Sequence, residues 1–129
     1  MKKNTILVIE DERPLAEAIK TKFQKNDFEV VSARSVKEAL GFLEAQVKVN
    51  FIWLDHYLLG KENGLDFVAE IKKSGSKWKN IPVYVVSNTA SPDKVRSYLQ
   101  LGVEKYYTKA DYRLDQIVKD LEKHIKFVG

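Results

Sequence analysis

The feature that most constrains this chain is the run Phe-Ile-Trp-Leu-Asp at residues 51–55. Four large apolar residues follow one another without the polar alternation of a half-exposed strand, so the run predicts a strand buried on both faces. Asp55 stands where this strand leaves the core. In an open parallel sheet, ligands bind at the carboxyl ends of the strands. We therefore expect Asp55 to lie at a functional edge of a sheet.

Four other runs predict the remaining strands of that sheet. Residues 6–9 and 83–86 are apolar throughout, whereas 28–31 is mixed and 105–108 is short. The segments that follow these runs carry apolar residues at helical spacing, beginning with Leu15, Ile19 and Phe23. Five strands alternating with five helices predict one α/β domain over residues 1–129, a (βα)5 doubly wound parallel sheet. The edge character of 28–31 favours the flavodoxin-like strand order 2-1-3-4-5.

The composition argues against several classes of protein. The chain has 129 residues and no cysteine, so neither a disulfide framework nor an oxidising compartment is indicated, and we expect a cytoplasmic protein. The net charge of +4 comes from 22 basic and 18 acidic residues spread along the chain, which favours an ordinary solvated surface over a nucleic-acid partner. The first apolar run is too short for a signal peptide or a membrane span.

Acidic residues follow two strands that the predicted order makes neighbours. Glu10 and Asp11 follow the first strand, and Asp55 follows the third. Carboxylates that meet in one crevice repel one another, and a hard divalent cation such as Mg²⁺ relieves that repulsion. Taken singly, Asp11 could favour a helix N-terminus and Asp55 could cap a turn. Their joint occurrence at adjacent strand ends favours a magnesium site.

Two further polar residues end the strands on the other side of Asp55. Ser87 follows the fourth apolar run, and Lys109 follows the fifth. A hydroxyl that donates a hydrogen bond and an ammonium that neutralises charge are the groups that a phosphoryl group attached to Asp55 would need. With Glu10 and Asp11 they form a pattern that places one polar element at each strand end, which is more specific than any short motif.

These residues lie in motifs through which the chain resembles a bacterial two-component response-regulator receiver domain of the stand-alone, chemotaxis-receiver type. The motifs are ILVIEDE at 6–12, WLD at 53–55, NGL at 63–65, VVS at 85–87 and YYTK at 106–109. The resemblance implies that Asp55 accepts a phosphoryl group from a histidine kinase or a phosphotransfer protein. It also implies a signalling protein that catalyses only its own phosphorylation and dephosphorylation.

The resemblance assigns roles to the other site residues. Mg²⁺ would be held by Asp11, Asp55 and the backbone carbonyl of Tyr57, with Glu10 acting through water. Ser87 and Tyr106 would be a switch pair that remodels the face made by the fourth helix, the fifth strand and the fifth helix. An unidentified downstream protein would bind that face, with no role for nucleic acid or a membrane.

The sequence departs from the family pattern at several positions. Ala110 follows Lys109 where the family usually has a cis proline, and we expect a trans bond because cis costs about 3–4 kcal/mol before a residue other than proline. Asn88 replaces a small residue, and we expect it to narrow access to Asp55. Tyr57 and Thr89 stand where the family tunes the loss of phosphate.

Two alternatives remain open. The first is a degenerate receiver that binds partners without phosphorylation, which Asn88 and Ala110 favour. The second is a magnesium-dependent phosphatase with an aspartate nucleophile, whose second aspartate would stand where this chain has Tyr57.

Three other aromatic residues have structural interpretations, one of them, Trp53, inside the WLD motif. Neighbours on an extended segment point to opposite sides, so we expect no chemical role for His56 beside Asp55. His124 is expected to be a solvated position on the last helix, and Trp53 is expected to lie in the core. A basic cluster surrounds Trp78 and is more typical of a solvated helix end than of a nucleic-acid patch; it contains Lys72, Lys73, Lys77 and Lys79.

Overall fold

The computed structural model describes residues 4–88 and 91–128, so Thr89 lies outside the described residues. Five strands and five helices alternate along this part of the chain. The strands are β1 (Thr5–Ile9), β2 (Glu29–Ala33), β3 (Phe51–Leu54), β4 (Val83–Ser87) and β5 (Lys105–Thr108). The helices are α1 (Arg13–Gln24), α2 (Val36–Glu44), α3 (Gly64–Lys72), α4 (Pro92–Leu101) and α5 (Leu114–Val128). None of these helices combines the length and the apolar character that crossing a membrane requires.

All strands are parallel and form one sheet of order β2-β1-β3-β4-β5, which confirms the predicted fold class. The predicted second strand is displaced: it begins one residue later than expected and runs on to Ala33. Ser32 and Ala33 extend it because they pair with Val8 and Ile9, although neither residue has strong strand character of its own.

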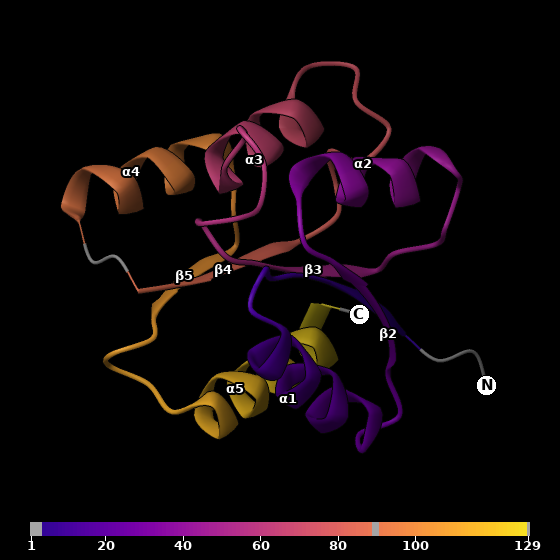
Figure 1. Ribbon diagram of the computed structural model, residues 1–129, viewed down its shortest axis with the longest axis vertical. Helices are drawn as coiled ribbons and strands as arrows, with labels where there is room; N and C mark the ends of the chain where they lie inside the picture. The colour runs from indigo at the N-terminus through magenta and orange to yellow at the C-terminus, as the bar shows by residue number, and fades with distance from the viewer. Residues whose placement is uncertain (1–3, 89–90, 129) are drawn as a thin grey trace.

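The helices cover both faces of the sheet. Figure 1 shows α2, α3 and α4 on one face and α1 and α5 on the other. The side chains of β3 alternate between these layers, with Ile52 and Leu54 in the first core and Phe51 and Trp53 in the second. All four are buried, as the unbroken apolar run predicts. Both cores therefore pack on β3, and Asp55 leaves the sheet between them.

Local capping fixes one loop at each edge of the sheet. Asn63 begins α3 with a reciprocal capping box: its side chain accepts from the Asp66 backbone N–H at 3.1 Å, and the Asp66 carboxylate accepts from the Asn63 backbone N–H at 2.8 Å. α4 ends at Gly102, whose φ of 101° is the left-handed conformation that glycine adopts without strain. These caps determine where α3 begins, after β3 at the carboxyl edge, and where α4 ends, before β5 at the amino edge.

Candidate functional site

The register of β1 and β3 brings three carboxylates together. Ile9 pairs with Leu54, so the residues that follow each strand meet at the same edge. Glu10, Asp11 and Asp55 each offer an oxygen, and these oxygens all lie within 4.8 Å of one another. Glu10 and Asp55 are 1% and 6% exposed, and Asp11 is half-buried. The predicted convergence is confirmed.

Lys109 reaches the same cluster from the end of β5. Its Nζ lies 3.1 Å from Glu10 Oε1 and 3.5 Å from Asp55 Oδ2. Its backbone N–H donates to the carbonyl of Ser87 at 2.8 Å, which positions the residue just beyond the β4–β5 pairing. The described residues contain no cis peptide bond, so the predicted trans bond to Ala110 is confirmed. The missing proline therefore does not turn the ammonium away from Asp55.

Ser87 and Tyr106 are in direct contact. Ser87 is fully buried at the end of β4. Burial raises the pKa of the half-buried Tyr106, and a hydrogen bond with the Ser87 side chain acts in the opposite direction. The Tyr106 ring also lies 5.7 Å from that of Tyr98 on α4, measured between centroids. Tyr106 thus connects the end of β4 to the helix beside it.

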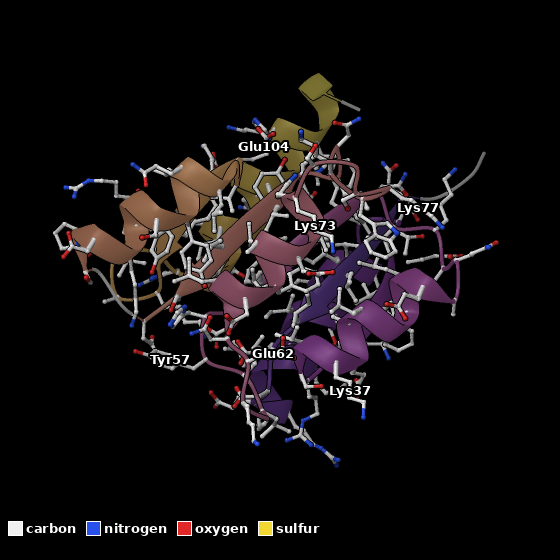
Figure 2. All side chains as sticks on the ribbon, turned by 90° about the horizontal axis from the view of Figure 1, so that it is seen from above. Lys37, Tyr57, Glu62, Lys73, Lys77 and Glu104 are labelled. Carbon is white, nitrogen blue, oxygen red and sulfur yellow. The ribbon has the colours of Figure 1, made fainter. Side chains whose placement is uncertain are left out.

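Tyr57 lies two residues after Asp55 in the loop that follows β3 and is 54% exposed. Its hydroxyl accepts a hydrogen bond from Lys94 Nζ at 3.1 Å, and this nitrogen lies 5.0 Å from the ring centroid. Figure 2 shows Tyr57 and Glu62 at one end of the sheet, and Lys73, Lys77 and Glu104 at the opposite end. Tyr57 and Lys94 therefore join the loop after β3 to α4 at the surface. The nearby Asn88 is also exposed.

The electrostatics of the cluster favour an additional cation. Burial, and then the charge of Asp55, raise the pKa of Glu10 to about 7, while the Lys109 ammonium acts in the opposite direction. One ammonium thus faces three carboxylates. Oxygen donors in a partly buried, acidic pocket are the set that Mg²⁺ or a similar hard cation prefers. The residues present fit such an ion.

Glu10 predicts a pH dependence of cation binding. Since a cation competes with the proton on Glu10, we expect Mg²⁺ affinity to be at least roughly tenfold weaker at about pH 5.5 than at about pH 8. Calorimetric titration of the protein with Mg²⁺ across this range measures the change. Glu10→Gln, which removes the titrating group, should flatten the dependence. An unchanged slope in that variant would assign the proton to another residue.

The stability of the metal-free protein should change in the opposite direction. The pKa of Glu10 is higher in the folded state than its ordinary value of 4.5, so the folded protein binds this proton more tightly than the unfolded chain does. The resulting stabilisation is complete below about pH 4.5 and is lost as pH rises through about 7. The two pKa values differ by an amount equivalent to about 3 kcal/mol. Denaturant titrations without Mg²⁺ measure this loss.

Sequence reasoning missed one residue that shapes the site. Arg34 follows β2, and its guanidinium donates from Nε and Nη2 to the backbone carbonyl of Asp11 at 3.1 and 3.0 Å. The carbonyl of Arg34 in turn accepts from the N–H of Leu59 at 3.1 Å. Arg34 therefore ties the Asp11 loop to the loop after β3. The position of Arg34 directly after β2, the strand next to β1, could have predicted this contact from the sequence.

The expectation for His124 is wrong, and His56 has a partner that the sequence did not reveal. His124 was expected in solvent, but it is half-buried and its Nδ1 is hydrogen-bonded to the hydroxyl of Tyr84 at 2.5 Å. His56 is buried, its Nδ1 is hydrogen-bonded to the Tyr98 hydroxyl at 2.6 Å, and burial lowers its pKa. Neither partner was predicted, because a buried tyrosine needs a hydrogen-bond partner and the sequence does not show which residue supplies it.

The basic cluster around Trp78 is only partly a solvated helix end. Lys72 is half-buried, and its Nζ donates to the carbonyls of Lys79 and Ile81, both at 2.7 Å. Lys73 pairs with Glu70 at the surface. Lys72 thus closes the turn between α3 and β4.

A flavodoxin-like sheet with an acidic pocket at the junction of β1 and β3 defines the class of this protein, and comparisons with known proteins identify its family. Residues 6–122 match the family model described as the response regulator receiver domain. The chain belongs to this family, whose members are signalling modules of two-component systems.

Its relatives come from plants and bacteria. The chain is 30% identical over 104 residues to the two-component response regulator ORR12 of Oryza sativa subsp. japonica, covering 81% of this chain and 84% of the relative. Among solved structures, the phosphorylated cyanobacterial phytochrome response regulator RcpA is 31% identical, with a TM-score of 0.83 over 95% of this chain and 93% of the other. The Mn²⁺-bound form of response regulator Rcp1 is 29% identical, with a TM-score of 0.77 over 88% and 86%.

Proposed function

We propose that this receiver accepts a phosphoryl group on Asp55 from a histidine kinase or a phosphotransfer protein, in a reaction that requires Mg²⁺. The observation that carries the proposal is the placement of Lys109, whose ammonium lies against both Glu10 and Asp55 beside the oxygen cluster. A relative captured in phosphorylated form and another with Mn²⁺ bound support the same chemistry.

The residues divide the work of phosphoryl transfer. An Asp55 carboxylate oxygen attacks phosphorus, the P–N bond of the donor phosphohistidine breaks, and the imidazole leaves with the electron pair. Lys109 neutralises charge on the transferred group, and Ser87 donates a hydrogen bond to one of its oxygens. Asp11, Asp55 and the backbone carbonyl of Tyr57 would hold Mg²⁺, with Glu10 acting through water. When bound, the ion supplies positive charge opposite the oxygens of the group in transfer.

The output of the domain is a change of surface. A phosphoryl group adds negative charge and acceptor oxygens beside Ser87, which favours whichever arrangement of Ser87 and Tyr106 reaches it. The two side chains are already hydrogen-bonded, so a movement of the Ser87 hydroxyl changes the orientation of the Tyr106 side chain. A downstream protein would sense this change at the face made by α4, β5 and α5. Catalysis is limited to the domain's own phosphorylation and dephosphorylation.

Intact-mass spectrometry tests the proposal. We expect the wild-type protein to gain the mass of one phosphoryl group when incubated with acetyl phosphate and Mg²⁺, and none when EDTA replaces Mg²⁺. Hydroxylamine, which attacks acyl phosphates, should remove the added group. A protein that stays unmodified with Mg²⁺ would instead support the degenerate receiver.

The phosphatase alternative receives no support from the site. Such an enzyme needs a second carboxylate two residues after the nucleophile to act as an acid and base. Here that position is Tyr57, whose hydroxyl is engaged by Lys94 at 3.1 Å. Multiple-turnover hydrolysis of a small phosphate ester, measured as released phosphate, would favour the phosphatase.

Tyr57 is expected to prolong the life of the acyl phosphate. Its ring packs against that of His56, which follows Asp55, and Lys94 holds it at the surface, so it can limit the approach of water to Asp55. We expect Tyr57→Ala to accelerate loss of the phosphoryl group several-fold, measured by intact mass after the donor is removed. Tyr57→Phe keeps the ring and should decay at nearly the wild-type rate. Equal rates in all three proteins would contradict this role.

A further inference from the structure

A second polar connection leaves Asp55 and does not involve Ser87 or Tyr106. The backbone N–H of His56 donates to Asp55 Oδ1 at 2.7 Å. The imidazole Nδ1 of the same residue is hydrogen-bonded to the Tyr98 hydroxyl at 2.6 Å, and the two rings meet edge to face with centroids 5.7 Å apart. Both side chains are buried, and Tyr98 belongs to α4. His56 therefore touches the predicted phosphoacceptor with its backbone and α4 with its side chain.

The start of α3 leaves room for this contact. A Cβ at Gly64 would collide with the Tyr98 hydroxyl and would lie 3.0 Å from the backbone carbonyl of Asp55. The N–H of Gly64 also donates to the carbonyl of His56 at 2.9 Å. Only glycine allows α3, the His56 backbone and the Tyr98 hydroxyl to approach this closely. The link is thus enclosed on the side of α3 as well as on that of α4.

We propose that His56 is a positioning residue that couples the charge state of Asp55 to the position of α4 through Tyr98. This inference rests on the proposed function, because phosphorylation is the event that would change that charge. Formation of the bond between an Asp55 oxygen and phosphorus removes the carboxylate's delocalised charge, whichever oxygen reacts. The His56 N–H then loses a charged acceptor, and hydrogen bonds to charged acceptors are roughly twice as strong as those to neutral ones.

Weakening of the bond from the His56 N–H to Asp55 would affect α4, because the imidazole of His56 is hydrogen-bonded to Tyr98 on that helix. The imidazole cannot shift with its backbone unless the Tyr98 hydroxyl moves with it or the 2.6 Å bond breaks. A second side-chain link between this loop and α4, from Lys94 to Tyr57, lies at the surface, where water competes for it. By linkage, a partner that displaces α4 would also alter the surroundings of Asp55.

Amide hydrogen exchange of α4 tests the coupling, with Tyr98→Phe as the main variant. The chain offers a matched control, because Tyr84→Phe removes a comparable, partly buried tyrosine–histidine bond, to His124, on the other face of the sheet. In the unmodified protein we expect Tyr98→Phe to speed exchange in α4 by roughly 2- to 10-fold, the loss of one hydrogen bond. If the bond were merely structural, Tyr98→Phe would speed α4 exchange by the same factor whether Asp55 is charged, neutralised or modified.

Two arms change that state. In the first, beryllofluoride with Mg²⁺ mimics the phosphoryl group. In the second, Asp55→Asn neutralises the acceptor without any phosphodonor and forms a double-mutant cycle with Tyr98→Phe. We expect each change to alter α4 exchange in the wild-type background and in Tyr84→Phe. In Tyr98→Phe the response to Asp55→Asn should fall to within about twofold of no change, whereas the response to beryllofluoride should only be reduced, because the connection through Ser87 and Tyr106 remains. His56→Leu, which keeps the backbone N–H and removes the imidazole, should match Tyr98→Phe.

The outcomes separate this inference from the proposed function. If Asp55→Asn alters α4 exchange equally with and without the Tyr98 hydroxyl, the coupling is overturned even where Asp55 takes the phosphoryl group. If α4 does not respond to Asp55→Asn in the wild-type background, it is overturned as well. Should the protein resist phosphorylation while the double-mutant cycle shows coupling, the proposed function fails and the link from Asp55 to α4 remains.

Discussion

The Asp55→Asn variant is expected to gain no phosphoryl group under conditions in which the wild-type protein gains one. The amide is nearly isosteric with the carboxylate, so Lys109 and the His56 N–H keep a neighbour of the same shape. What the variant lacks is the anionic oxygen that attacks phosphorus. Because no other carboxylate replaces that nucleophile in the same geometry, the expected effect is complete loss, read by intact mass.

The matched control is Asp93→Asn. Asp93 lies in the first turn of α4, its side chain is 92% exposed, and its carboxylate pairs with Arg96 at the surface at 3.4 Å. This variant should incorporate the phosphoryl group as the wild type does. Full modification of Asp55→Asn would contradict the assignment and would direct attention to Glu10 or Asp11, whose oxygens lie in the same cluster.

The loss of labelling should not reflect a damaged fold. Asp55 is one of the causes that raise the pKa of Glu10, so neutralising it removes repulsion between two buried carboxylates. We therefore expect Asp55→Asn without Mg²⁺ to be at least as stable to heat as the wild type near pH 8. A lower midpoint would mean that Asp55 contributes more through its hydrogen bonds than it costs through repulsion.

The sequence predicted the architecture because each level of its pattern agrees with the others. Apolar runs of four or five residues can be satisfied only by strands with helices on both faces, and β3 is buried over its full length as its composition requires. The end of β2 was less predictable. Ser32 and Ala33 join the sheet through pairing with β1, a tertiary effect that local propensity does not contain.

The site also has a part that could be predicted, because strand topology determines it, and a part that could not, because it depends on side-chain packing. Because the carboxyl ends of parallel strands lie at one edge of a sheet, the sequence was enough to predict that four residues lie close together: Glu10, Asp11, Asp55 and Lys109. The contact partner of the His56 side chain could not be predicted. Alternation correctly pointed it away from Asp55, but its partner, Tyr98, lies 42 residues further along the chain, on a helix whose placement is a property of the packed fold.

Trp53 carries the largest expected effect on stability. It is fully buried on β3, and its ring meets that of Phe23 edge to face with centroids 5.9 Å apart. Trp53→Ala should lower the free energy of unfolding by about 3–5 kcal/mol, through lost burial and the cavity left between β3 and α1. That is a large share of the roughly 5–15 kcal/mol that holds a typical domain folded. Denaturant titration followed by circular dichroism measures it.

Trp53→Phe separates ring burial from the indole nitrogen. Nε1 of Trp53 is buried and finds no acceptor among the described protein atoms, so phenylalanine removes an N–H that the fold does not satisfy while keeping an aromatic contact with Phe23. We expect it to cost less than half of what alanine costs. Equal losses would show that the whole indole volume is needed to keep α1 in place. Since β3 ends in Asp55, such a result would make the packing beneath the strand a determinant of the site above it.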